Sequence, residues 1–507
     1  MTVDQSQFEY VCSHCRETAL LEGAVALLEW DERTGMPPLG GDYRAKQIAA
    51  LSGLIHRRRT EDRLGDELRA LSLSNLASDP TSPQGCVIHR LLRDYERDRR
   101  LPAELVAAIA EATSRGQQAW EAARKAQDFA QFLPTLERII ALKREAAVLL
   151  ANGGDPYDAL LDLYEPDAKQ ATLAVQFEHL RGSLVQLLES IRASPRKVDS
   201  SILHRFYPMS AQAALARRAA EAIGFDFNAG RLDVTAHPFC TTLGPRDIRL
   251  LTRYDEWHLA SGLYGALHEA GHGLYEQGLD TQWYGLPPGT MVSLGIHESQ
   301  SRLWENAVGR SRAFWRYLLP EARQAFPKAL GDASVDELFA AVNAVRPSLI
   351  RVEADEVTYN LHIIIRFELE RRLISGALQP NDLPGAWNEA YRTNLGISPA
   401  NDGEGVLQDV HWSAGLFGYF PTYTLGNLAA AQWIHAARRA LGDLDDQWSR
   451  GQFRPLLEWL REHVHRWGRR LTSDDLILRA TGQPLTASCL VNDLWEKHAE
   501  VYGVGRN

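Results

Sequence analysis

Apolar residues recur along most of this chain at steps of three and four, the spacing that places side chains on one face of an α-helix. In the segment 101–129, Pro102 stands where a first helical turn tolerates proline. The apolar positions that follow share one predicted face: Leu105, Ile109, Ala112, Ala119 and Ala123. Comparable patterns, rich in good helix formers, predict helices within residues 132–150, 173–194 and 210–224. The chain is therefore expected to be mainly α-helical.

The best strand candidates are two short segments with β-branched residues, 232–244 and 247–255. Because a predicted helix rich in histidine follows them directly, we expect a small sheet beside that helix. No Gly/Ser-rich linker, charge block or repeat of fixed period divides the chain. The sequence predicts a single helical domain over residues 1–507, and the pattern also allows two lobes that flank a central groove.

Composition narrows the class of protein. The chain has 507 residues, 45% of them apolar, and its 65 acidic against 55 basic residues give a net charge of −10. This balance argues against a nucleic-acid partner, which usually meets a basic field. The chain shows neither a cationic leader nor an apolar run of about 18 residues, so we expect a cytoplasmic protein without a membrane partner. The five cysteines are expected to be reduced.

The segment LHEAGHGLYEQGL, from Leu267 to Leu279, contains the pattern H-E-x-x-H. In an α-helix, residues four apart point the same way, so His268 and His272 can hold one metal ion. Glu269 lies roughly 60° around the helix from His272, close enough to reach a water molecule without being a metal ligand. The pattern therefore predicts a metal site with Glu269 as general base.

A catalytic zinc also needs a third protein ligand and an open position for water. Glu276 lies about 6 Å further along the helix axis than His272, which makes a compact cluster difficult. Glu298 follows a connection long enough for the chain to turn back, and it is the better candidate. With zinc, the water's pKa would fall toward about 7, and Glu269 could remove its proton. The alternatives are a chance H-E-x-x-H and a Glu298 that only interacts with a helix dipole.

Two further segments carry candidates for binding a peptide. Helical spacing puts five polar residues on one face: Arg351, Asp355, Tyr359, His362 and Arg366. This face could line a wet cleft, but on spacing alone we favour an ordinary solvated surface. If the substrate is cut at its C-terminus, a guanidinium can hold the free carboxylate through two parallel hydrogen bonds, and Arg351 and Arg249 are the candidates.

The stretch 403–427 is dense in aromatic residues, glycine and polar side chains. Gln408 and His411 could form hydrogen bonds with a substrate backbone, and Tyr419 or Tyr423 could donate to an oxyanion. Aromatic core packing is the alternative, and we favour it for Phe417, Tyr419 and Phe420. For His411 and Tyr423 we favour a function.

Several motifs, taken together and in this order, resemble one family. They are HPF (His237–Phe239), DIRLLT (Asp247–Thr252), HEAGH (His268–His272), HESQ (His297–Gln300), IRVEADEVTYNLHIIIR (Ile350–Arg366) and GVLQDVHW (Gly405–Trp412). The chain resembles the carboxypeptidase Taq family of zinc metallocarboxypeptidases, and weaker likeness extends almost from end to end. H-E-x-x-H alone is shared by many hydrolases, but the combination is highly specific.

The resemblance implies an almost wholly helical fold with a deep active-site groove, similar to thimet-type oligopeptidases. It also implies a homodimer that removes single residues, with broad specificity, from peptides with a free C-terminus. One Zn²⁺ per subunit is expected, for which Co²⁺ could substitute. The family's zinc ligands map onto His268, His272 and Glu298, and its catalytic base maps onto Glu269.

The remaining family residues map less directly. The arginine that binds the substrate carboxylate corresponds to Arg351, and the tyrosine that assists the oxyanion corresponds to Tyr423. Asp247 and Arg249 belong to a D-x-R-x-T pattern in which this chain has Leu251 in place of the threonine. Any hydrogen bond to substrate or structure that this threonine would make is therefore lost.

Zinc carboxypeptidase action is the leading hypothesis, and two others compete with it. A zinc oligopeptidase would use the same metal centre to cut peptides internally. A non-catalytic helical scaffold would keep zinc only for stability.

Overall fold

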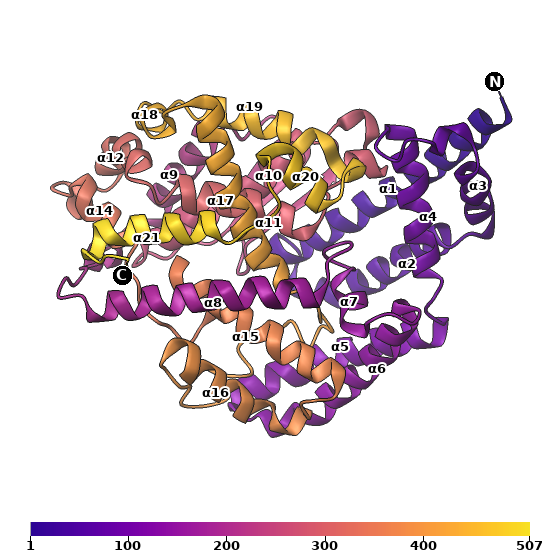
Figure 1. Cartoon of the computed structure of the whole chain (residues 1–507), viewed down its shortest axis with the longest axis horizontal. Helices are drawn as coiled ribbons and strands as arrows, with labels where there is room; N and C mark the ends of the chain where they lie inside the picture. Colours follow the sequence, from indigo (N-terminus) through magenta and orange to yellow (C-terminus); the bar gives the residue numbers. More distant parts are fainter. Residues whose placement is uncertain (1, 507) are drawn as a thin grey trace. The chain divides into compact units, whose positions relative to one another are not determined.

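The computed structural model describes residues 2–506, and it is mainly helical with one three-stranded sheet. Figure 1 shows the helices along the chain. The contacts group the chain into two compact units. The first consists of the chain up to Asp98, residues 199–342 and residues 429–485; the second consists of residues 99–198, 343–428 and the chain from Thr486. The single domain expected from the sequence stays a prediction.

The first unit contains the sheet and most of the helices. Its helices are α1 (Val3–Thr34), α2 (Gly41–Arg59), α3 (Asp62–Ser72), α4 (Pro83–Asp98), α9 (Met209–Ala222), α10 (Leu259–Gly278), α11 (Leu294–Arg302), α12 (Arg312–Ala325), α13 (Pro327–Leu330), α14 (Val335–Val342), α18 (Leu444–Ser449), α19 (Arg454–His463) and α20 (Ser473–Thr481). A π-helical segment, Leu303–Val308, directly follows α11. Helix α17 (Pro421–Leu441) begins in the second unit and continues into the first.

The second unit is helical. Its helices are α5 (Ala103–Ala126), α6 (Leu133–Ala151), α7 (Pro156–Leu161), α8 (Gln170–Ala193), α15 (Glu356–Ser375), α16 (Leu383–Leu395) and α21 (Ser488–Tyr502). Helix α8 packs against both α15 and α21, as Figure 1 shows. Helix α15 is buried on almost every side, and this places its polar residues inside the unit.

The four predicted helices are confirmed as α5, α6, α8 and α9, with ends within a few residues of the predicted segments. In α5, Pro102 precedes the first helical residue, and Leu105 and Ala123 of the predicted apolar face are buried together with Trp120. The helical spacing of apolar residues therefore identified both the elements and the side that faces the core.

The predicted sheet is also present, with one difference. Strand β3 (Asp247–Thr252) is central, parallel to β1 (Gly230–Val234) and antiparallel to β2 (Phe239–Gly244). The candidate segment 232–244 is thus two strands rather than one. These strands pair with opposite edges of β3, so the chain between them must cross from one edge to the other.

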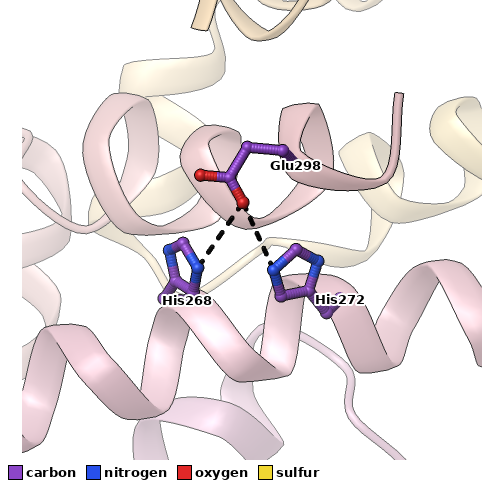
Figure 2. A group of neighbouring side chains, drawn as sticks. All are labelled: His268, His272 and Glu298. Carbon is purple, nitrogen blue, oxygen red and sulfur yellow. Dashed lines mark ion pairs between the residues drawn. The ribbon is translucent and has the colours of Figure 1, made fainter. Parts of the chain in front are cut away.

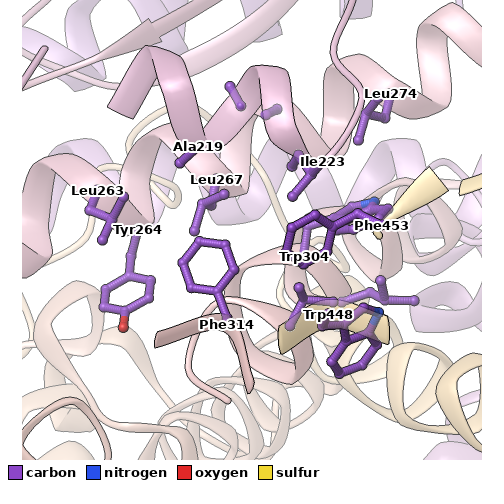
Figure 3. Packing of buried hydrophobic residues seen from close by; sticks show 14 of the residues in the cluster. Ala219, Ile223, Leu263, Tyr264, Leu267, Leu274, Trp304, Phe314, Trp448 and Phe453 are labelled. Atoms are coloured by element: carbon purple, nitrogen blue, oxygen red, sulfur yellow. The ribbon is translucent and has the colours of Figure 1, made fainter. Parts of the chain in front are cut away.

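A large apolar core in the first unit holds α10 in place. Figure 3 shows Leu263, Leu267 and Leu274 of α10 packed among aromatic residues that include Trp304 and Phe314, and all of them are buried. Burying each such side chain contributes about 1.5–3 kcal/mol to stability. The helix that carries the H-E-x-x-H pattern is therefore fixed along its length by packing.

The structure can be compared with two expectations from the sequence, on membrane spans and on cysteines. Within residues 2–506, no helix has the length and apolar character needed to cross a membrane. All five cysteines are free thiols, as their number and spacing predicted.

Candidate active site

Helix α10 carries His268 and His272 one turn apart, and α11 packs across it (Figure 2). Gly271 makes this close crossing possible, because a Cβ atom there would lie 2.6 Å from both the carbonyl oxygen of Gln300 and the Cα of Ser301. The close approach brings Glu298 of α11 over the two imidazoles. The structure thus brings together the predicted histidine pair and the carboxylate that the sequence proposed as third ligand.

The three side chains point at one common position. One carboxylate oxygen of Glu298, Oε2, lies 3.6 Å from Nε2 of His268 and 3.4 Å from Nε2 of His272. All three ligand atoms lie within 4.8 Å of one another, as a group that could hold a metal ion. Two imidazole nitrogens and one carboxylate oxygen form a common donor set of catalytic zinc sites.

The other ring nitrogens show where the imidazole protons lie. Nδ1 of His268 donates to Oε2 of Glu305 at 2.9 Å, and Nδ1 of His272 donates to the carbonyl oxygen of His297 at 3.1 Å. The neutral His272 imidazole therefore presents a lone pair on Nε2 toward Glu298. Burial opposes the charge of His268, but Glu298 and Glu305 raise its pKa to about 9, so its Nε2 carries a proton toward Glu298 at the place where a cation would lie. The residues present therefore fit a metal ion.

A second layer of charged groups orients Glu298. Its Oε1 accepts a hydrogen bond from Nε of Arg302 at 2.6 Å, and its Oε2 accepts one from Oγ of Ser301 at 2.9 Å. Arg302 also reaches Oε2 of Glu305 at 3.3 Å, so it links the carboxylate beside His268 to the candidate ligand. Glu305 lies in the π-helical segment, a feature that often occurs at functional sites. Sequence reasoning missed Arg302 and Glu305.

Burial and charge shift the pKa values in this cluster. Burial raises the pKa of Glu269 to about 7, close to the value that suits a general base at neutral pH. Burial lowers the pKa of His272 to about 3, which keeps its imidazole neutral. Burial opposes ionisation of Glu305, but Arg302 lowers its pKa to about 2. His272 is thus neutral, as metal coordination requires, and Glu305 is ionised beside His268.

Glu276, which the helix geometry set aside as a ligand, is engaged elsewhere. Its Oε1 lies 3.0 Å from Nε2 of His297, and its Oε2 accepts a hydrogen bond from Thr242 at 3.0 Å. It is not part of the cluster of His268, His272 and Glu298.

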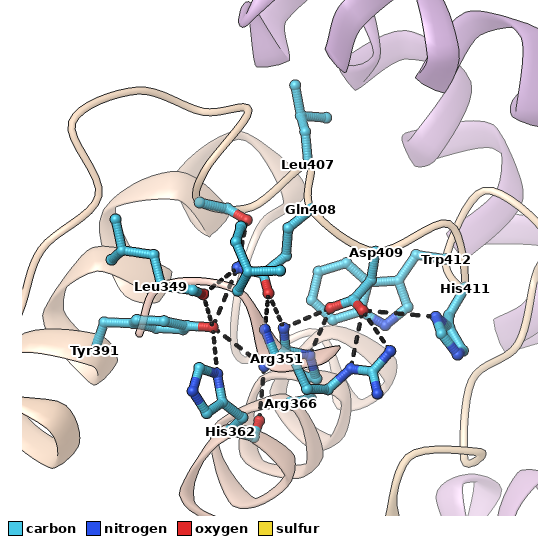
Figure 4. A network of polar contacts seen from close by, with 12 residues as sticks. Leu349, Arg351, His362, Arg366, Tyr391, Leu407, Gln408, Asp409, His411 and Trp412 are labelled. Carbon is cyan, nitrogen blue, oxygen red and sulfur yellow. Dashed lines mark hydrogen bonds and ion pairs between the residues drawn. The ribbon is translucent and has the colours of Figure 1, made fainter. Parts of the chain in front are cut away.

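A second cluster lies in the other unit and contains Arg351, Arg366 and Gln408 of the residues predicted to bind a peptide. Figure 4 shows Asp409 between the guanidinium groups of Arg351 and Arg366. Asp409 Oδ1 accepts from Nε of Arg351 at 3.0 Å, and its Oδ2 accepts from Nε of Arg366 at 2.7 Å. Gln408 Oε1 accepts from the backbone N–H of Arg351 and from Arg366. Two guanidinium groups share one carboxylate here, which leaves an excess positive charge.

The expectation of a solvated face is wrong for this part of α15. Arg366 and His362 are fully buried, and Arg351 is 6% exposed. Asp409, about forty residues further along the chain, supplies the charge that lets both arginines be buried. Arg351 lies in a short 3₁₀ turn ahead of α15, so it shares the cluster but not the helix.

His411 and Tyr423 are close together, with 3.4 Å between Nε2 and the phenol oxygen. Nδ1 of His411 is buried and lies 3.9 Å from Oδ1 of Asp409, which is beyond hydrogen-bond distance. Phe417 and Phe420 are buried, as the core-packing interpretation predicted, whereas Tyr419 is half-buried. The imidazole of His411 therefore has an unused polar atom.

Asp247 and Arg249 pair with each other in β3. Two hydrogen bonds of 3.0 Å join them, and the Arg249 guanidinium lies 4.3 Å from the centre of the Trp30 ring. These contacts favour a structural role, and substrate binding by this pair stays a prediction. Leu251 and Thr252 are both fully buried, and the Thr252 hydroxyl has no hydrogen-bond partner among the described residues.

Comparisons with known proteins agree with this geometry. Residues 10–498 match the family described as Carboxypeptidase Taq (M32) metallopeptidase. The chain is 47% identical to thermostable carboxypeptidase 1 of Thermus thermophilus, covering 98% of this chain and 99% of that protein. It is 39% identical to carboxypeptidase 1 of Bacillus subtilis, covering 94% and 95%.

Solved structures show the same fold. The M32 carboxypeptidase from Deinococcus radiodurans superimposes with a TM-score of 0.94 at 42% identity, covering 98% of this chain and all of that one. A carboxypeptidase from Pyrococcus furiosus gives a TM-score of 0.93 at 35% identity, covering 97% and 99%. The chain therefore belongs to the carboxypeptidase Taq (M32) family, and it is a metallocarboxypeptidase.

Proposed function

We propose that this protein is a zinc carboxypeptidase that removes single residues from peptides with a free C-terminus. The observation that carries the proposal is the convergence of two imidazole Nε2 atoms on Oε2 of Glu298, at 3.6 and 3.4 Å. The Nδ1 hydrogen bonds of both rings turn the two Nε2 atoms toward the position that a cation would take. Zinc is the metal we propose because His, His and carboxylate are ligands that it commonly takes in hydrolases.

His268, His272 and Glu298 would hold the ion. Zinc, when bound, would supply a Lewis acid that polarises the scissile carbonyl group and lowers the pKa of a water molecule. Glu269 takes a proton from the attacking water and then delivers it to the nitrogen of the leaving amino acid. Its raised pKa, about 7, suits both the uptake and the release of a proton.

We assign carboxylate binding to Arg351 and oxyanion assistance to Tyr423. The shared Asp409 neutralises only one of the two guanidinium groups beside it, so the cluster can accept one more negative charge. The amide oxygen of Gln408 accepts hydrogen bonds from Arg351 and Arg366. This favours a role for Gln408 in holding the arginines rather than in contacting the substrate. His411 has a buried Nδ1 without a hydrogen-bond partner, which favours direct contact with the substrate.

Glu269→Gln tests the chemistry. The amide keeps the shape of the side chain but cannot accept and return a proton. We expect the variant to bind zinc as the wild type does, and to lose about 10²- to 10⁴-fold in kcat. Full activity in a variant that holds zinc would refute the assigned base.

An oligopeptidase that cuts internally is the second candidate, and the blocked C-terminus separates the two. Matched peptides with a free acid and with a C-terminal amide would be compared by mass spectrometry. We expect stepwise loss of terminal residues from the free acid only. Equal cleavage of both peptides, or internal cuts, would favour the oligopeptidase. The family assignment disfavours the third candidate, a non-catalytic scaffold.

Three finer proposals follow from the family resemblance rather than from the geometry. We propose a homodimer in the cytoplasm, broad specificity for the released residue, and Co²⁺ as a functional substitute for Zn²⁺. Light scattering, a panel of C-terminal residues and metal replacement test these three in turn.

A further inference from the structure

Glu370 is a fully buried carboxylate in the second unit, and the proposed chemistry does not use it. It lies on α15, one helical turn after Arg366. Its Oε2 accepts hydrogen bonds from the Tyr157 hydroxyl and from the backbone N–H of Gly418, both at 2.9 Å. Its Oε1 accepts one from the indole N–H of Trp412 at 2.8 Å. Three neutral donors thus converge on one buried acid.

Two of these donors belong to the same loop, residues 408–420, which leads into α17. Trp412 begins the turn that Gly415 closes, Gly418 lies beyond that turn, and Glu370 joins Trp412 to Gly418. Arg366 holds the start of the loop through Gln408 and Asp409. Helix α15 therefore fixes the 408–420 loop at three points, by two side chains one turn apart.

The backbone at Gly418 adds to this constraint. Its φ of +83° is in the region that favours glycine, and a Cβ atom there would lie 2.7 Å from the carbonyl carbon of Leu160. The loop therefore passes directly against the end of α7 at the residue that donates to Glu370. The loop backbone therefore has little room to move at Gly418.

His411 lies between the fixed points, next to Trp412. Its ring is 4.5 Å from the Phe420 ring and 5.4 Å from the Tyr419 ring, measured between centroids. The hydrogen bonds of the imidazole do not hold it tightly, since Nδ1 has no hydrogen-bond partner among the described residues and Nε2 is 3.4 Å from Tyr423. The position of His411 therefore depends on the loop backbone and the rings around it.

We propose that Glu370 is a positioning residue, whose carboxylate holds the 408–420 loop in the conformation in which His411 and Tyr423 meet the substrate. This inference rests on the proposed function, because it assumes that the loop binds peptide. Burying a carboxylate is unfavourable unless hydrogen bonds compensate for the lost water. The consequence for the geometry is that one carboxylate fixes two separate points of the loop.

Two substitutions, each of which removes one donor to Glu370, separate positioning from general stability. Trp412→Phe removes the indole donor, which is on the loop, whereas Tyr157→Phe removes a donor on α7 and leaves both loop contacts. Each variant loses one hydrogen bond to the same carboxylate, and Trp412→Phe also loses buried ring contacts, so we expect the larger loss of stability in Trp412→Phe. We expect KM for a free-acid peptide to rise about tenfold in Trp412→Phe and to stay within about twofold of wild type in Tyr157→Phe.

Glu370→Gln, measured at pH 8, checks the effect without changing the volume of any ring. Its amide group cannot accept at both ends, so it must release at least one of the donors, and we expect KM to rise with kcat within about threefold of wild type. Equal KM values for Trp412→Phe and Tyr157→Phe, or an unchanged KM in Glu370→Gln, would overturn the proposal.

Hydrogen exchange supplies a readout that does not depend on activity. Amides of residues 410–418 should exchange faster in Trp412→Phe than in Tyr157→Phe, because only the first variant loosens the loop. Equal protection in the two variants would also overturn the proposal. If the wild type releases no residues from any peptide, the proposed function fails, while the exchange comparison still decides whether Glu370 holds the loop.

Discussion

Nδ1 of His268 lies 2.9 Å from a carboxylate oxygen of Glu305, so a buried acid behind the first candidate ligand fixes which nitrogen faces the metal position. The same Glu305 oxygen lies 3.3 Å from Arg302, whose Nε donates to the third candidate ligand, Glu298. One ligand histidine and the ligand carboxylate are thus held in register by a single pair of charged residues. This relationship predicts that metal affinity depends on residues that do not touch the metal.

Glu305→Gln should weaken zinc binding by about tenfold to a hundredfold. The neutral amide accepts the hydrogen bond from His268 more weakly than the carboxylate does, and it no longer forms an ion pair with Arg302. Competition with a chelating indicator measures the Kd directly. Glu321→Gln is the matched control, since Glu321 pairs with Arg218 at the surface of the same unit. An unchanged Kd in Glu305→Gln would show that Glu305 does not support metal binding.

Arg351→Met should raise KM for free-acid peptides by about 10- to 100-fold, which is the loss expected for charge-assisted hydrogen bonds to a carboxylate. Asp409 keeps Arg366 as its partner, so the buried acid is not left unpaired. Arg249→Met is the comparison, because Arg249 is occupied by Asp247. We expect its KM to change by less than about twofold; a larger effect there than at Arg351 would reverse the assignment.

Tyr423→Phe should lower kcat by about 10²-fold with little change in KM, as expected when one oxyanion donor is lost. Tyr419→Phe removes a hydroxyl from the neighbouring ring, 5.5 Å away between centroids, and should leave kcat within about threefold of wild type. Steady-state kinetics on one peptide distinguishes the two. The opposite ranking would assign the oxyanion role to Tyr419.

The pH dependence of stability should carry the signature of Glu370. Burial raises the pKa of this carboxyl group from 4.5 to about 7, so the folded protein binds its proton more tightly than the unfolded chain does. Its contribution to stability is fully present below pH 4.5 and is lost as pH rises through about 7.

Glu370→Gln should remove that dependence. Between pH 5 and pH 8, wild type should lose about 3 kcal/mol of stability relative to the variant. Thermal unfolding of both proteins across this range measures the difference. Parallel curves for the two proteins would show that Glu370 does not titrate near neutral pH.

Much of the metal cluster could be predicted from the sequence because helical geometry is local. The relative positions of His268 and His272 follow from the period of the helix alone. Glu298 could be proposed because the chain between it and the pair is long enough to turn back. Glu305, which lies behind His268, could not be predicted in this way. A π-helical segment places it, and no periodic pattern in the sequence signals such a segment.

The cluster around Asp409 shows a different limit. Spacing placed the polar residues around Arg366 together, but it could not decide between a solvated face and a buried one. That choice depends on Asp409, which lies about forty residues away in sequence and neutralises the buried charge. Glu370 was missed for a similar reason, because its donors come from α7 and from the 408–420 loop. Contacts across long sequence separations determine the environment of each of these groups.

Titration of the metal-free protein with zinc tests the central claim most directly. Release of C-terminal residues from a free-acid peptide would be followed by mass spectrometry as zinc is added to wild type and to Glu298→Ala. We predict that wild-type activity rises until one zinc is bound per chain, whereas Glu298→Ala binds zinc weakly and stays inactive at the same zinc concentration. Full activity without metal, or a Glu298→Ala protein that binds zinc and cleaves as wild type does, would contradict the account.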